Sequence, residues 1–169
     1  MTAGVNEAAT DEWVAETTTF QRVRSVMRTT YDGQTTSEIA ARAHVSETTA
    51  RKHLEDLAES GYVDSSPSSE GATRYARSTE SLILEEAHDI LERVETGELV
   101  QQITDMEAEL ESYRDEFDAE NPEQAAIAGT VIDQQTLTAW QTTRRNLSFA
   151  RTALALSESK ETVQATNAV

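Results

Sequence analysis

The sequence has 169 residues and a net charge of −17, with 31 acidic residues against 14 basic ones. It has no cysteine, which excludes disulfides, thiolate metal sites and a cysteine nucleophile, and it has no run of about 18 apolar residues that would span a membrane. Its length suits one domain of ordinary size, or one small domain with a helical appendage. Since Met1–Asp11 lacks the basic and apolar regions of a signal peptide, we expect a cytoplasmic protein.

The charge is unevenly distributed along the chain. Residues 20–78 hold eight basic and eight acidic residues, whereas residues 79–169 hold 19 acidic and 6 basic ones. Lysine accounts for two of the 14 basic residues, Lys52 and Lys160. This composition resembles that of proteins from extreme halophiles, whose high net charge keeps them soluble; an acidic protein from an ordinary cell is the alternative.

The first part of the sequence predicts a tail and a helix. Residues 1–11 are expected to form a flexible tail. From Trp13 onward, apolar residues recur at helical spacing, which predicts an amphipathic helix that ends near Tyr31. Asp32-Gly33 is a typical stop signal.

Two further helices are expected around a tight turn. Thr35–Glu38 has the spacing of a capping box and predicts a short helix over Ser37–Ala43. After a turn at His44-Val45, Ser46 is suited to cap a longer helix through Glu59, which Gly61 ends in a left-handed conformation. The residues expected to hold the two helices together are Ile39, Ala40, Val45, Ala50 and Leu54.

A β-hairpin is expected after these helices. Tyr62–Ser65 and Thr73–Arg77 predict its two strands, and Ser66–Gly71 has the composition of a loop. The order of these elements predicts a winged helix-turn-helix over residues 12–78. The fold class is therefore mainly α with a small β-hairpin wing.

A helical region is expected over residues 79–158. Apolar spacing predicts a helix over Ser81–Val94, a break at Thr96-Gly97 and a second helix over Leu99–Phe117. Asn121-Pro122 is expected to stop this second helix.

The end of the chain predicts a long helix and a tail. A loop is expected to run to about Ile132, and a last helix from Asp133 to about Glu158. Its predicted buried side carries Leu137, Trp140, Leu147, Ala150 and Leu154. Residues 159–169 are expected to form a flexible polar tail.

Apolar residues at heptad spacing make the helical region a candidate for coiled-coil-like dimerisation. The alternative is that the helical tail folds back onto its own domain; Trp140 is suited to a contact across the dimer interface or to anchoring the last helix to its own subunit. The candidate dimerisation residues are Ile83, Ala87, Ile90, Val94, Leu99, Ile103, Met106, Leu110, Tyr113, Phe117, Trp140 and Leu147.

A helix-turn-helix places its second helix in the major groove of duplex DNA, where the first turns of that helix meet base edges. Here the second helix runs from about Ser46 to Ser60. The candidate DNA contacts on the two helices are Thr36, Ser37, Ser46, Glu47, Thr48, Thr49, Arg51, Lys52 and His53.

Three stretches of sequence, Ser37–Ala40, Val45–Leu54 and Leu57–Val63, resemble the winged-helix domain of ArsR-like archaeal regulators. The resemblance covers Phe20–Ser78, and the remainder resembles haloarchaeal regulators with a helical tail. It implies that the hairpin is a wing on the DNA backbone or minor groove, and that the metal sensing of cysteine-bearing members is absent here. The wing residues that it implicates are Ser68, Ser69, Thr73, Arg74 and Arg77.

Other polar residues give no sign of an enzyme, a metal or a cofactor. His44 and His53 lack further ligands at a suitable spacing, and the carboxylate pairs are expected in a chain with 31 acidic residues. The basic cluster at Thr142–Asn146 is suited to ion pairs with acidic helices, or to a second DNA contact.

These patterns favour one function over another. The first hypothesis is a homodimeric transcriptional regulator that binds a two-fold site in double-stranded DNA, because a palindromic site requires a two-fold protein. The alternative is a protein-interaction adaptor that uses its acidic helical tail.

Overall fold

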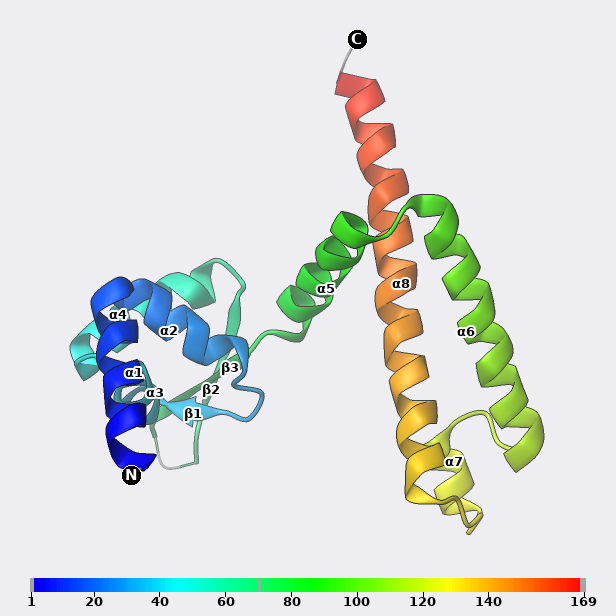
Figure 1. Ribbon diagram of the computed structural model, residues 1–169, viewed down its shortest axis with the longest axis horizontal. Coiled ribbons are helices and arrows are strands. Elements are labelled where there is room, and N and C mark those ends of the chain that lie inside the picture. Colours follow the sequence, from blue (N-terminus) through cyan, green and yellow to red (C-terminus); the bar gives the residue numbers. More distant parts are fainter. Residues whose placement is uncertain (1, 70, 168–169) are drawn as a thin grey trace. The chain divides into compact units, whose positions relative to one another are not determined.

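A computed structural model describes residues 2–69 and 71–167 of the chain. The chain divides into two units, Met1–Leu82 and Ile83–Val169, and each has its own hydrophobic core (Figure 1). Among the residues described, no helix combines the length and the apolar character needed to cross a membrane.

The first unit combines helices with a small antiparallel sheet. Its helices are α1 (Thr2–Glu16), α2 (Thr19–Arg28), α3 (Thr36–Ala43) and α4 (Glu47–Glu59). Its strands, in the spatial order β1-β3-β2, are β1 (Gln34–Thr35), β2 (Val63–Pro67) and β3 (Thr73–Arg77). Helices α2, α3 and α4 pack on one another and on the sheet. The predicted winged helix-turn-helix order is therefore confirmed.

The hairpin differs from its prediction at its edges. Strand β2 continues to Pro67, which lies opposite Thr73, whereas a strand ending at Ser65 was expected. The two residues of β1 pair with β3 and were not foreseen, because two residues are too few to show a strand pattern. The added pairing ties the start of α3 to the wing.

The predicted caps of α3 and α4 are confirmed. Thr35 and Glu38 form a reciprocal capping box at the start of α3, and the Ser46 hydroxyl accepts a hydrogen bond from the Thr49 amide at the start of α4. The turn between them contains His44 in a left-handed conformation with φ of 52°. Gly61 ends α4 with φ of 75°, a conformation that favours glycine.

The helix expected from Trp13 to Tyr31 is two helices, α1 and α2. The chain breaks at Thr17-Thr18, where Thr18 forms a capping box with Gln21 and starts α2. A threonine followed three positions later by glutamine or glutamate favours a helix cap over a helix interior. This local signal overrides the apolar periodicity.

Residues 1–11 were expected to form a tail, whereas Thr2–Asp11 belong to α1; residue 1 lies outside the described residues. The segment contains three alanines and one glutamate, Glu7, which have high helix propensity. The last turns of α1 are held because Trp13 packs against the core of the first unit. Apolar periodicity misses such a helix, since it buries little of its length.

In the part that the structure describes, the second unit consists of helices joined by loops, with no strand. Its helices are α5 (Thr79–Arg93), α6 (Thr96–Phe117), α7 (Pro122–Ile127) and α8 (Gln134–Asn167). The boundary between the units falls within α5. Helices α6 and α8 lie side by side and form the main packing of the unit (Figure 1).

Two predicted breaks act differently from the expectation. Thr96-Gly97 opens α6, and the interruption falls one residue earlier, at Glu95, which has an extended backbone. Asp118 ends α6 in a left-handed conformation, whereas Asn121-Pro122 starts α7. Asn121 caps that helix and Pro122 occupies its first turn, where proline is tolerated because no amide is needed. A helix therefore lies in the segment expected to be a loop.

The last helix, α8, extends beyond Glu158 to Asn167, so the tail expected over residues 159–169 is helical as far as the structure describes it. This part of the chain contains no glycine or proline to end the helix. The hydroxyls of Thr162 and Thr166 donate to backbone carbonyls one turn earlier.

The apolar seam of α6 is covered by α8 of the same chain. Leu99 is fully buried, Ile103 and Leu110 are buried, and Trp140 of α8 is fully buried against them. Tyr113 and Phe117 both stack on the Trp140 ring with centroids 5.6 Å away. The heptad pattern made these residues candidates for contact between two copies; in the structure, α8 of the same chain packs on them.

The other candidate dimerisation residues belong to the same core, except Ile83, which is half-buried outside the cluster. Ala87 and Leu147 are buried in it, and Ile90, Val94 and Met106 pack against it partly exposed. Of the predicted buried side of α8, Leu137 and Leu154 are half-buried, while Thr143 and Ala153 take buried positions.

Candidate nucleic-acid interface

Helix α4 has one buried face and one solvent-facing face. Ala50, Leu54 and Leu57 are buried against the first unit. Thr48, Arg51 and Lys52 are exposed on the opposite side, within the first two turns of the helix. This is the part of a recognition helix that meets base edges in a helix-turn-helix protein.

Arg51 and Lys52 make no hydrogen bond or ion pair with other described residues of the chain. Most arginines of the first unit are engaged: Arg22, Arg42 and Arg74 donate hydrogen bonds within it. The cations of α4 are therefore available to a partner.

The net charge of α4 is nevertheless negative. The helix carries four carboxylates against two cations, with the histidine neutral. Glu47 and Glu55 lie one turn before and one turn after Arg51, on the same face of the helix. Non-specific attraction to phosphate is therefore weak at this surface.

A hollow of about 430 Å³ separates α4 from the wing and from the start of α3. Arg51 lines it beside Glu47 and Glu55, and most of its other walls are hydroxyl groups and backbone. The remaining lining residues are Thr35, Thr36, Ser37, Gly71, Ala72, Thr73 and Tyr75. Hydroxyls, backbone amides and arginine are the groups that bind phosphate oxygens in protein–DNA interfaces.

The start of α3 is held by the Thr35–Glu38 capping box. The Glu38 carboxylate accepts hydrogen bonds from the Thr35 amide (2.7 Å) and hydroxyl (2.9 Å). These hydrogen bonds, the backbone one first, lower the pKa of Glu38 below its usual value of 4.5. The box fixes where Thr36 and Ser37 enter the hollow.

We expect Thr35→Ala to lower the free energy of unfolding by about 1 kcal/mol, the usual contribution of a threonine cap. Because the folded pKa of Glu38 is depressed, its contribution is present above the unfolded pKa and disappears as the pH falls through the folded pKa. The difference between wild type and Thr35→Ala should therefore shrink in acid. Urea unfolding at neutral and acidic pH measures it, with Thr36→Ala as the control; a loss equal in both variants would contradict the cap.

Buried Arg22 holds the turn that aims α4. Its Nε donates to the Ala43 carbonyl at 2.9 Å, where α3 ends. One terminal nitrogen donates to the carbonyls of Val14 (3.1 Å) and Thr17 (2.7 Å), where α1 ends. The guanidinium thus satisfies carbonyls that two helix ends leave without a partner, and the cationic group lies at the negative ends of both helix dipoles.

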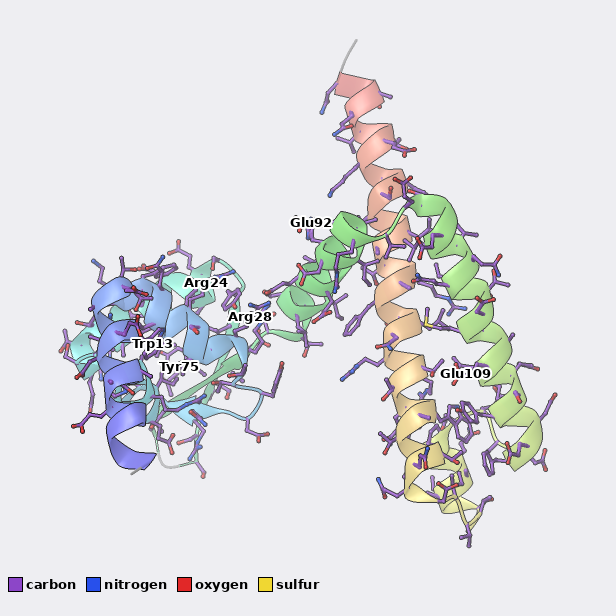
Figure 2. The ribbon with its side chains drawn as sticks, in the orientation of Figure 1. Trp13, Arg24, Arg28, Tyr75, Glu92 and Glu109 are labelled. Atoms are coloured by element: carbon purple, nitrogen blue, oxygen red, sulfur yellow. The ribbon has the colours of Figure 1, made fainter. Side chains whose placement is uncertain are left out.

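The wing arginines are occupied within the first unit. Arg77 is 5% exposed, and its guanidinium lies 3.8 Å from the centre of the Tyr62 ring, which Arg24 also covers at 4.5 Å (Figure 2 labels Arg24). Arg74 donates to the Gly33 carbonyl at 2.9 Å. Burial removes Arg77 from the candidate DNA contacts, because the residue faces the core side of β3.

At the tip, the wing offers hydroxyls and backbone. Ser69 is exposed and Ser68 is half-buried, with its amide bonded to the Ala72 carbonyl at 2.8 Å. Thr73 is exposed at the start of β3 and lines the hollow. The resemblance predicted basic residues near this tip. In the structure, the side chains of Arg74 and Arg77 instead contact the Gly33 carbonyl and the Tyr62 ring.

Three candidate residues of α4 are directed into the chain. Ser46 caps the helix, and its hydroxyl lies 2.9 Å from that of Thr49. The His53 Nε2 lies 2.9 Å from the Thr19 hydroxyl, and its ring meets the Phe20 ring edge-on. These contacts make Ser46 and His53 positioning residues.

In the second unit, the basic cluster at Thr142–Asn146 is partly engaged. Arg144 forms an ion pair of 2.8 Å with Glu123 of α7, which agrees with the ion-pair interpretation. Glu109 of α6 accepts a hydrogen bond from Thr143 of α8 (3.2 Å) and another from Tyr113 of its own helix (3.1 Å) (Figure 2 labels Glu109).

A family model matches residues 17–159 of the chain. The chain belongs to the DUF7342 family. This family is described as one of unknown function. The DUF7342 match starts directly after α1 and continues into α8, so both units belong to the family's common region. No curated protein matches the chain.

Among solved structures, a proposed DNA-binding protein of Ralstonia eutropha has a TM-score of 0.34 and 22% identity, covering 39% of this chain and 88% of its own. A MarR protein of Peptoclostridium difficile has a TM-score of 0.34 and 15% identity, covering 84% and 82%. The transcriptional regulator SlyA has a TM-score of 0.33 and 14% identity, covering 86% and 84%. The strand order and helix packing of this DUF7342 protein are themselves those of a winged helix.

Proposed function

We propose that the protein is a transcriptional regulator that binds specific sequences in double-stranded DNA. The observation that carries the proposal is the exposed, unpaired state of Arg51 and Lys52 on the first turns of α4. The opposite face of the same helix is anchored in the core. A rigid helix with free cations on its leading half is suited to the major groove.

The side chains of α4 are better suited to contacts with base edges than to contacts with phosphates. Arg51 is suited to a bidentate contact with guanine, and a glutamate such as Glu47 can accept from the amino group of cytosine. Thr36, Ser37 and Thr73 line the adjacent hollow, where hydroxyls fit the DNA backbone. We therefore expect the operator to have G·C pairs where the first turns of α4 contact it.

We further infer that two copies act together. Each α4 presents few readout side chains, and specific sites are commonly read by two-fold proteins. The surface that joins the copies lies outside the α6 seam, whose side chains α8 already covers. Light scattering in high-potassium buffer tests the stoichiometry; a monomer on a single half-site would contradict it. The acidic, lysine-poor composition supports a high-salt setting, and the resemblance of Phe20–Ser78 supports an ArsR-like haloarchaeal regulator.

We expect Arg51→Ala combined with Lys52→Ala to weaken binding to a selected duplex by about tenfold or more, because one good guanine contact contributes roughly 1–3 kcal/mol. The duplex is first selected from a random library with the wild-type chain in high-potassium buffer. Affinity is then measured by fluorescence anisotropy.

The matched control is Glu59→Ala, also on an exposed face of α4 but in its last turn. It should leave the selected sequence unchanged. Because each copy has at most two free cations for phosphate, the logarithmic slope of affinity against salt should be no steeper than about −2 per copy, at roughly −0.9 per neutralised phosphate. Equal affinities for the double variant and the wild type would contradict the role of α4.

The acidity of α4 favours one alternative, a protein-interaction adaptor. Its four carboxylates and the acidic second unit suit a partner with a basic surface. Co-purification of one protein that the Arg51→Ala and Lys52→Ala changes leave bound, with no duplex enriched, would favour the adaptor.

A further inference from the structure

A groove of about 630 Å³ runs along one face of the α6–α8 pair in the second unit. Leu110 of α6 and Leu147 of α8 are buried residues that form its apolar floor. Its volume lies in the range of pockets that hold small organic ligands, roughly 300–1,000 Å³.

The groove concentrates positive charge in an acidic unit. Residues 83–169 contain 18 acidic and 6 basic residues. Three of these six, Arg114, Arg144 and Arg151, line the groove, together with the carboxylates of Glu107 and Glu111. The lining alone therefore has a net charge of +1, and with Glu120 and Glu123, which pair with Arg114 and Arg144 from outside the lining, the cluster has −1, against −12 for the unit as a whole.

Each of these guanidinium groups is held by at least one carboxylate, and the Nε of Arg114 is also directed toward Glu120, 3.4 Å from its backbone carbonyl and 3.7 Å from its carboxylate. Arg151 contacts Glu107 at 2.7 Å across the groove, Arg144 contacts Glu123 at 2.8 Å, and Arg114 contacts Glu111 at 3.0 Å. Each contact uses one nitrogen of a group that has five donors. The carboxylates orient the three forks and leave donors for another anion.

These ion pairs are exposed and therefore exchangeable. The side chains of Arg114 and Arg144 are 40% exposed and that of Arg151 is 60% exposed. Exposed pairs contribute little to stability, so an incoming anion displaces a glutamate at small cost. Arginine binds planar carboxylate and phosphate groups through paired hydrogen bonds.

We propose that this groove binds a small organic anion with an apolar body, its carboxylate or phosphate group on Arg114, Arg144 and Arg151 and its hydrocarbon part on Leu110 and Leu147. The site lies within the second unit and does not depend on whether the first unit binds DNA. It gives the protein a place for a ligand that no known property of the family assigns.

The test is titration calorimetry of the full chain with 4-phenylbutyrate, phenyl phosphate and the uncharged 4-phenylbutyramide. At least one of the two anions is expected to bind saturably, and the preferred one identifies the head group. The amide should bind at least about tenfold more weakly. Arg114→Gln combined with Arg151→Gln should weaken the anion by about tenfold or more, with an unchanged melting temperature.

Arg145→Gln is the matched control, because it removes the same charge from the neighbouring position of α8, outside the groove lining. It should leave the affinity for the anion unchanged. The proposal is overturned if neither anion binds, if the amide binds equally well, or if Arg145→Gln weakens binding as much as the groove variant does.

Discussion

Replacing Arg22 with alanine is expected to lower the free energy of unfolding of the first unit by about 3 kcal/mol. The change leaves the carbonyls of Ala43, Val14 and Thr17 without the donor that holds them, in a place where Arg22 is only 6% exposed. Since Ala43 ends α3, the turn before α4 loses its support. DNA binding should therefore fall together with stability.

The chain offers a clean readout of this variant, because its two tryptophans, Trp13 and Trp140, fall one in each unit. Urea unfolding in a Trp140→Phe background follows Trp13 alone. Arg51→Ala removes an equal charge from an exposed site and should change stability little. Arg22→Lys keeps the charge without the planar fork, and it should recover less than half of the loss. A loss below about 1 kcal/mol in Arg22→Ala would show that water replaces the guanidinium.

Trp140→Ala is expected to destabilise the second unit by about 3–5 kcal/mol, as is usual for a large aromatic residue in a core. Trp140 is fully buried, and its ring stacks on Tyr113 and Phe117. This stack joins α6 to α8 at the end of the pair next to α7. Such a loss is a large share of the 5–15 kcal/mol typical of a whole domain, so much helical signal should disappear with it.

The control for this variant is Phe149→Ala, a half-buried aromatic position of α8 outside the core cluster. Circular dichroism in urea should show a smaller loss for it. An intrachain core makes the loss in Trp140→Ala independent of protein concentration. If the wild type instead loses helix on dilution and Trp140→Ala shifts that transition, the seam joins two copies.

The first unit could be read from the sequence because its signals are local. Thr35, Ser46 and Gly61 each mark a helix end by side-chain chemistry, and the structure has all three where expected. The candidate site on α4 follows from these caps, since they set which residues lie on its exposed first turns.

The second unit could be predicted less well, because an apolar pattern does not show which helix packs against it. A heptad seam predicts that a helix packs, and the choice between α8 and another copy depends on the three-dimensional path of the chain. Asp118 shows the same limit at a helix end, because a left-handed aspartate has a weak sequence signal. Polar helices such as the end of α8 carry no apolar period at all.

The arginines show where residue type alone misleads. Arg22, Arg74 and Arg77 have the same side chain as Arg51, yet the structure uses the first three to join backbone carbonyls or cover a tyrosine ring. The structural role of Arg22 can be distinguished from the exposed position of Arg51 only when the burial of each helix face is known.

Genome-wide occupancy mapping in the native host tests the central claim most directly, with the full-length chain compared with its Arg51→Ala and Lys52→Ala double variant. We predict discrete sites that share a two-fold motif with G·C pairs, and their loss in the variant at equal protein level. A flat map for the wild type, or sites that the variant retains unchanged, would contradict DNA recognition by α4.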